Sequence, residues 1–175
     1  MPSTNRSPSL YTVDGGVLSL SGPDLKDLLA AVLARGVPFR FRALGMSMDP
    51  FIKDGDVITV GKVKEDNLRI GDVVAYCSPP DGHLVVHRIV RRSPGGLLVI
   101  RGDANDEADA VALLTDVLGR VKLVQRLGRR VYLGMGPERF VLAHVSRRGL
   151  LRPLIARVRV STNRLRHVLR GVRVA

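Results

Sequence analysis

The sequence has little of what anchors or cross-links many small proteins: it contains one cysteine and no long apolar run. Because Cys77 is alone, an intramolecular disulfide is excluded, which fits a reducing compartment. A helix that spans a membrane needs about 20 consecutive apolar residues, whereas the best N-terminal run covers only residues 28–33. Residues 1–11 are polar and rich in serine and proline, without the pattern of a secretory signal. We therefore expect a cytoplasmic protein with neither signal peptide nor transmembrane segment.

Acidic residues are nearly absent from the last third of the chain. Residues 1–119 carry 13 Lys and Arg against 15 Asp and Glu, while residues 120–175 carry 15 Lys and Arg against Glu138 alone. The whole net charge of +12 therefore resides in the C-terminal third, where it favours anionic partners such as lipid head groups or nucleic acid.

Few aromatic residues accompany this charge. Tyr132 and Phe140 are the only ones in the basic third, which gives no stacking pattern for nucleic acid. The apolar islands 140–145 and 150–155 lie among arginines and favour a helix in an anionic membrane interface. A nucleic-acid arm and a solvated basic tail stay open as alternatives.

Apolar spacing predicts one helix and several strands. Five residues recur at helical spacing before Gly36 and Pro38 end the run: Leu25, Leu28, Leu29, Val32 and Leu33. Short β patterns then dominate, at residues 39–44, 57–60, 72–76, 84–90, 97–101 and 119–127, separated by Gly, Pro and Asp clusters. The sequence therefore predicts a mainly β fold, a small curved sheet or partly closed barrel, with one N-terminal helix and a basic, helical C-terminal extension.

Several short motifs carry groups for chemistry. They are Gly45-Met46-Ser47-Met48-Asp49-Pro50, Gly55-Asp56, Gly71-Asp72, Val86-His87-Arg88 and Gly102-Asp103. A serine hydroxyl is nearly inert at neutral pH, so it needs a neighbouring base, which works best when a third group orients it. Ser47, His87 and either Asp103 or Asp109 could fill these roles. The set indicates a serine peptidase.

Each group also has an ordinary structural interpretation. Ser47 precedes an acidic residue and a proline, so it could simply cap a turn. His87 shares one face of its predicted strand with Val85 and Ile89, where a histidine is often a core residue bonded to a backbone carbonyl. The acidic run 102–109 could be a solvated turn, and it lacks the glycine and the closing acid of a calcium loop. The presence of all the motifs in one chain favours the catalytic interpretation.

The order of these motifs between residues 41 and 124 resembles the signal peptidase superfamily, the β-fold serine peptidases that include the LexA-type self-cleaving repressors. There the nucleophile lies in a turn like Ser47-Met48-Asp49-Pro50, and Gly-Asp pairs follow. The histidine-type enzymes of archaea and the endoplasmic reticulum carry their base in a Val-His-Arg strand, like Val86-His87-Arg88. The resemblance implies a β fold of this type, Ser47 as nucleophile, His87 as base, and an extended peptide substrate with small residues beside the cleaved bond.

The same resemblance implies roles for the two carboxylates. Asp109 matches the second residue of the family's Asp-Asp pair and would orient His87, while Asp103 would support the site. Ala108 replaces the first residue of that pair. Relatives of the lysine type carry their base elsewhere, and the lysines nearest to the serine lie in predicted loops: Lys53, Lys62 and Lys64.

Three neighbours of the serine are candidates for binding substrate. Gly45 stands where signal peptidases usually have a serine that assists the oxyanion hole, so backbone N–H groups would hold the oxyanion here. The sequence Gly-Met-Ser-Met is more typical of the LexA-type repressors. Met46 and Met48 either form an apolar floor for the substrate or pack in the core.

Nothing in the sequence points to a metal or another cofactor. His83, His144 and His167 have no ligand-like spacing, and Cys77 has no histidine partner at a motif spacing, so an inert thiol is expected. No metal and no cofactor are assigned.

We therefore expect a polar N-terminal segment (1–22), a catalytic domain (23–128) and a basic amphipathic extension (129–175) that touches the inner membrane surface. The predicted activity is serine endopeptidase action on a peptide or protein substrate. Two alternatives stay open. One is a LexA-like self-cleaving regulator, although too little chain precedes residue 39 for a helix-turn-helix domain. The other is an inactive peptide-binding or scaffold module with the same fold.

Overall fold

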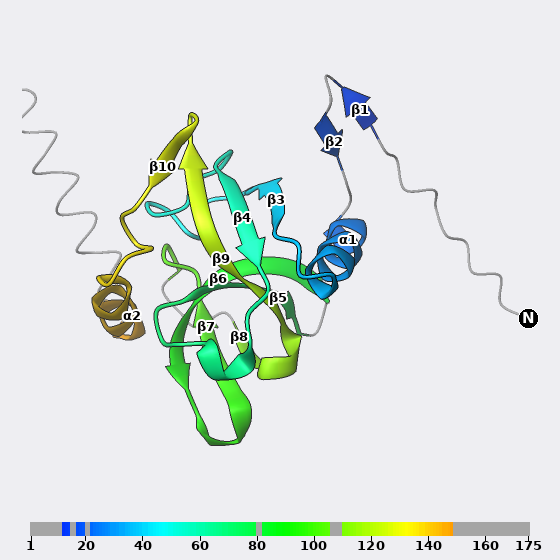
Figure 1. The fold of residues 1–175 in the computed structure, drawn as a ribbon. Coiled ribbons are helices and arrows are strands. Elements are labelled where there is room, and N and C mark those ends of the chain that lie inside the picture. Colours follow the sequence, from blue (N-terminus) through cyan, green and yellow to red (C-terminus); the bar gives the residue numbers. More distant parts are fainter. Residues whose placement is uncertain (1–11, 15–16, 20–21, 80–81, 106–109, 149–175) are drawn as a thin grey trace, which may run out of the picture.

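A computed structural model describes residues 12–14, 17–19, 22–79, 82–105 and 110–148 (Figure 1). Its elements, in chain order, are β1 (Thr12–Asp14), β2 (Val17–Ser19), α1 (Gly22–Ala34), β3 (Phe39–Arg42), β4 (Val57–Gly61), β5 (Val73–Ser78), β6 (His83–Arg92), β7 (Leu97–Arg101), β8 (Ala110–Leu113), β9 (Val117–Arg126), β10 (Arg129–Val131) and α2 (Arg139–Arg147). Short 3₁₀ turns occupy Glu65–Asn67, Pro94–Gly96 and Leu114–Asp116.

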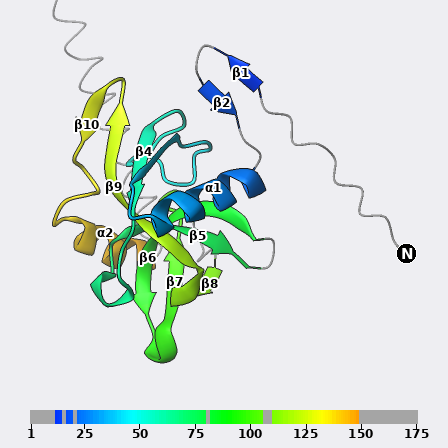
Figure 2. The ribbon, with the colours of Figure 1, turned by 45° about the vertical axis from the view of Figure 1, so that its right-hand side comes forward.

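Eight strands form one antiparallel sheet in the order β3-β4-β9-β5-β6-β7-β8, with β10 paired to β9. One edge of strand β9 pairs with β4 through residues 120–125, and its other edge pairs with β5 through residues 117–120 and with β10 through residues 124–126. The sheet curls strongly, with α1 on one side and α2 on the other (Figures 1 and 2). The mainly β, strongly curved fold with one helix before it and one after it is confirmed. Strands β1 and β2 form a separate two-stranded hairpin that the sequence did not predict.

The core has two parts because successive residues of β5 face opposite sides of the sheet. Val73 and Ala75 pack in one cluster with Leu29 and Leu33 of α1, whereas Val74 and Tyr76 pack in the other. The apolar spacing that predicted α1 thus places its leucines on the first cluster. Burial of both faces explains why β5 reads as a continuous apolar run rather than as an alternating one.

Residues 129–148 pack on the sheet. Strand β10 follows β9 through the turn Leu127–Gly128, where both residues have positive φ, 49° and 76°. Helix α2 contacts β6, and a Cβ on Gly71 would lie 2.7 Å from the carbonyl oxygen of Arg139. The boundary expected after residue 128 therefore falls inside a β hairpin, while residues 149–175 of the expected extension lie outside the described residues.

In the described ranges, neither helix is long and apolar enough to cross a membrane.

Candidate active site

Ser47 lies in a tight turn within the loop between β3 and β4. Backbone hydrogen bonds shape the turn, with Asp49 N–H donating to Met46 O and Phe51 N–H donating to Met48 O, both at 3.0 Å. The Met48 side chain is 4% exposed and packs in the first core cluster, so it anchors the turn. The half-buried Ser47 side chain is thereby held by a fixed backbone rather than by a mobile loop tip.

The Ser47 hydroxyl and the His87 imidazole form the central contact of the site. Ser47 Oγ lies 2.8 Å from His87 Nε2, although 40 residues separate them in the chain. His87 projects from the middle of β6, where its backbone pairs with Val74 of β5, and it is 7% exposed. This separation is within hydrogen-bond reach of the proton that a base must remove from the serine. The structure thus brings together the two residues that the sequence proposed as nucleophile and base.

The loop that follows β7 packs directly under the serine. Ala104 N–H donates to Ser47 O at 2.8 Å. A Cβ on Gly102 would lie 2.7 Å from the same carbonyl oxygen, a distance that real Cβ atoms do not adopt. Only glycine fits there without moving the backbone of the serine turn. The sequence showed the Gly-Asp motif but not this contact.

Asp103 pairs with Arg88. Its Oδ1 accepts from Arg88 Nε at 2.8 Å and its Oδ2 from Arg88 Nη2 at 2.7 Å, and both side chains are 0% exposed. Arg88 Nη1 also donates to the carbonyl oxygens of Gly71 and Gly134, at 2.8 and 2.9 Å. Arg88, the residue after His87, thus connects four segments of the chain from a buried position: β6, the loop after β7, and the segments at Gly71 and Gly134. Asp103, which was expected to support the site, is thus bound to the neighbour of His87 in the chain, while Asp109 lies outside the described residues.

The other two Gly-Asp pairs play the same structural part. Asp56 accepts from Arg126 Nε and Nη2 at 2.9 and 2.7 Å and from Lys53 N–H at 2.8 Å. Burial alone raises the pKa of Asp56, but these hydrogen bonds outweigh it, so the net pKa lies below its ordinary value. Asp72 is 2% exposed and lies 3.2 Å from Arg120 Nη1. Each Gly-Asp carboxylate is therefore a buried anchor for an arginine of another strand.

The three residues proposed beside the serine are placed differently from one another. Gly45 N–H donates to Asp54 Oδ1 at 2.9 Å, and Gly45 has φ +91°, which favours glycine. Met46 is 74% exposed beside the serine, whereas Met48 is a core residue. Met48 therefore packs in the core, whereas Met46 is exposed and open to a ligand.

A cavity of about 350 Å³ opens beside Ser47. It is bounded by the end of β3 and the following residues on one side, and by the first half of β6 on the other. Its lining is mostly apolar: Leu25, Phe41, Arg42, Ala43, Leu44, Gly45, Ser47, Met48, Ile52, Leu84, Val85 and Val86. The Ser47 hydroxyl thus lies on the wall of a mostly apolar cavity, where it could reach one bond of an extended ligand bound there.

The described residues offer no evident place for a metal. In those ranges, no three His, Cys, Asp or Glu side chains gather as ligands would. Cys77 is half-buried at the end of β5, and burial raises the pKa of its thiol, with smaller opposing and reinforcing effects from Lys26 and Asp116. A raised pKa disfavours the nucleophilic thiolate.

Comparison with known proteins adds no assignment. No protein-family model matches the chain, and no curated protein matches it significantly.

Proposed function

We propose that the protein is a serine endopeptidase of signal-peptidase-like type, with Ser47 as nucleophile and His87 as general base. The observation that supports this best is the contact of 2.8 Å between Ser47 Oγ and His87 Nε2. The cavity beside the pair adds a place for substrate.

The proposed reaction is acyl transfer to Ser47 and then to water. His87 Nε2 takes the hydroxyl proton as Ser47 Oγ bonds to the scissile carbonyl carbon, and backbone N–H groups of the serine turn hold the oxyanion. His87 then protonates the leaving nitrogen, the C–N bond breaks, and an ester on Ser47 remains. Water attacks this ester while His87 takes its proton, and His87 then gives that proton to Ser47 Oγ as the bond between the acyl carbon and Oγ breaks, which releases the acid and restores the serine. Asp109 is proposed to orient His87, since both oxygens of Asp103 bind Arg88.

The substrate is proposed to bind as an added strand between β3 and β6. Among the described strands, β3 pairs only with β4. Strand β7 pairs with β6 from Arg88 onward, so residues 83–87 of β6 pair with β5 alone. These two strand edges border the cavity, and an extended peptide could hydrogen-bond to them while its side chains alternate into the apolar lining. Small side chains beside the cleaved bond suit the close approach that the serine requires.

A peripheral place on the cytoplasmic side of a membrane is the location we propose. Two exposed apolar side chains of α2, Phe140 and Val141, accompany its arginines, and the net charge of the C-terminal third is strongly positive. Anionic lipids attract such a surface, and apolar side chains add burial.

Cleavage of an extended peptide library by the purified chain tests the activity. Wild type and Ser93→Ala, a matched serine substitution between β6 and β7, should produce the same fragments, whereas Ser47→Ala should produce none while keeping its fold. Equal cleavage by Ser47→Ala would refute the proposal. Fragments of the protein itself, in the absence of peptide, would indicate the self-cleaving alternative, and peptide binding without cleavage by wild type would indicate the inactive module.

A further inference from the structure

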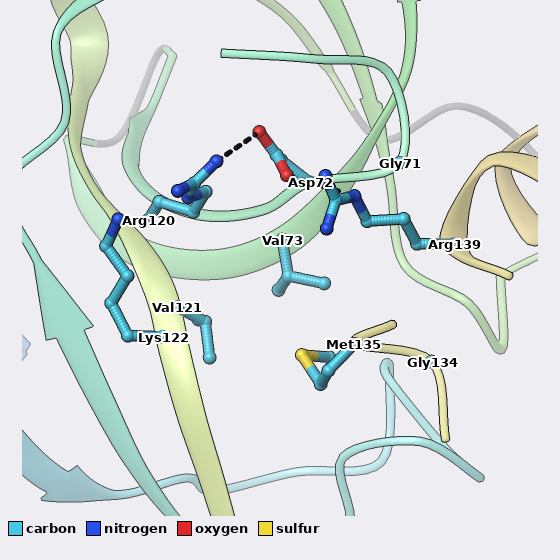
Figure 3. Close-up of a pocket in the computed structure, with 9 residues that line it drawn as sticks. All are labelled: Gly71, Asp72, Val73, Arg120, Val121, Lys122, Gly134, Met135 and Arg139. Atoms are coloured by element: carbon cyan, nitrogen blue, oxygen red, sulfur yellow. Dashed lines mark hydrogen bonds and ion pairs between the residues drawn. The ribbon is translucent and has the colours of Figure 1, made fainter. Parts of the chain in front are cut away.

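A second cavity lies away from Ser47, where β9 faces the start of α2. Its volume is about 130 Å³. Figure 3 shows Arg120 and Lys122 reaching from β9 on one side and Arg139 reaching from α2 on the other, with Asp72 between the two arginines. A cavity needs only about 10–15 Å³ of volume of this kind to hold one water molecule, so this one has room for a group as large as a phosphate.

The charges in this cavity are unequal. Asp72 is its only acidic lining residue, against the three cations Arg120, Lys122 and Arg139, which leaves a formal excess of +2. Within the described ranges, no carboxylate lies at ion-pair distance from Lys122. Partial desolvation lowers the pKa of Lys122 and the nearby Arg120 lowers it further, while Asp72 offsets only part of this effect. A bound anion would relieve this repulsion.

The two arginines keep donors for such an anion. A guanidinium carries five N–H groups, and the contact with Asp72 engages Arg120 through Nη1 at 3.2 Å. Arg139 Nε lies 3.4 Å from Asp72 Oδ1, an ion pair without hydrogen-bond geometry. Asp72 Oδ2 also accepts from Arg69 N–H at 2.9 Å, so the carboxylate is held in place by the backbone. Asp72 thus holds the two partly buried arginines at the cavity, while the Lys122 side chain lies exposed beside them.

An apolar groove of about 640 Å³ adjoins the cavity and shares Lys122 and Met135 with it. Its lining is mostly apolar, with Leu123, Val131, Tyr132, Leu133, Met135 and Pro137, and its charged residues are Lys122, Arg130 and Glu138. Tyr132 is 71% exposed and Leu133 is 64% exposed, so these side chains are open to a ligand. A cationic cavity next to an apolar groove fits a molecule that has an anionic head and an apolar tail.

We propose that the cavity and the groove together bind one anionic phospholipid, with its phosphate between Lys122 and Arg139 and an acyl chain along Tyr132 and Leu133. The site lies within the described domain and does not need residues 149–175. It also does not depend on catalysis at Ser47. Bound lipid would orient the body of the protein on the membrane, in addition to any attraction from the basic tail.

Binding of the full-length protein to phosphatidylglycerol and phosphatidylcholine vesicles tests this proposal. Lys122→Gln should weaken binding to phosphatidylglycerol about fivefold, since one basic residue at an anionic surface contributes that factor. Arg91→Gln removes the same charge from an exposed position on β6 and should have little effect. An equal loss in both variants would show that only net charge matters and would overturn the proposal.

Two further binding measurements distinguish a lipid ligand from free phosphate. Leu133→Asn, on the groove, should weaken vesicle binding but leave the affinity for inorganic phosphate unchanged. Wild type should prefer phosphatidylglycerol vesicles to inorganic phosphate, because only the lipid fills the groove. Binding of inorganic phosphate with no preference for the anionic vesicles, or an unchanged vesicle affinity in Leu133→Asn, would contradict the lipid assignment.

Discussion

Replacement of Asp103 by asparagine should destabilise the fold strongly. Asp103 and Arg88 are both 0% exposed and share two hydrogen bonds of 2.7 and 2.8 Å. Asn keeps the shape but removes the charge, and its amide donors face the donors of the guanidinium, so Arg88 becomes an uncompensated buried cation. Loss of one partner of a buried pair costs about 3–5 kcal/mol. For a chain of this size, that corresponds to a fall in Tm of about 6–20 °C.

Urea unfolding followed by far-ultraviolet circular dichroism measures this change, since the chain has no tryptophan. Asp27→Asn is the matched control, because Asp27 pairs with Lys26 at 3.6 Å with its side chain 78% exposed. A surface pair of this kind contributes about 0–1 kcal/mol. If Asp103→Asn lowers the free energy of unfolding by no more than the control does, then the buried cross-link has been misjudged. Where the variant is folded, it should keep most of its turnover.

Four other outcomes are expected. His87→Ala should lower kcat/KM for a cleaved peptide about a thousandfold or more, as loss of a general base does. Gly102→Ala should lower kcat on the order of 100-fold, because its Cβ would displace the carbonyl of Ser47. Asp109→Asn should reduce turnover more than Asp103→Asn does at a temperature where both are folded. Asp56 has a lowered pKa in the folded state, so its charged form stabilises the protein above the unfolded pKa of about 4. This contribution disappears as the pH falls through the folded pKa. The free energy of unfolding of Asp56→Asn, measured against pH, should therefore fall less steeply in acid than that of wild type.

Controls make these outcomes specific. Gly61→Ala places a Cβ 3.0 Å from the flexible side chain of Lys122 and should leave turnover unchanged. Activity that survives His87→Ala but is abolished by replacement of Lys53, Lys62 or Lys64 would favour a lysine base. If the free energy of unfolding falls equally with acid in wild type and in Asp56→Asn, then Asp56 does not cause the loss of stability in acid.

Much of the fold could be predicted because its signals are local. Apolar spacing was sufficient for α1, and short β patterns located six of the strands. Strand β10 was missed because its turn is Leu127–Gly128, and the Leu gives none of the usual Asn-Gly or Asp-Gly signal although both residues have positive φ. Strand β8 was missed because Ala110–Leu113 follows an acidic run that predicted only a loop.

The site was predicted in part. The motifs identified Ser47 and His87, and the structure places them in contact. The partner of Asp103 could not be read from the sequence, because a pairing with Arg88 depends on how β7 and β6 bring separate segments together. The methionines show the same limit, since a turn gives no fixed alternation that would separate the exposed Met46 from the buried Met48.

Reaction of the protein with a fluorophosphonate probe is the most direct test of the central claim, that His87 activates Ser47. The probe forms a covalent bond to a serine only when its hydroxyl is activated, and peptide mass spectrometry locates the adduct. We expect a single adduct on Ser47 in wild type, formed about a thousandfold more slowly in folded His87→Ala. The absence of an adduct on Ser47, or its formation at the same rate in His87→Ala, would contradict the account.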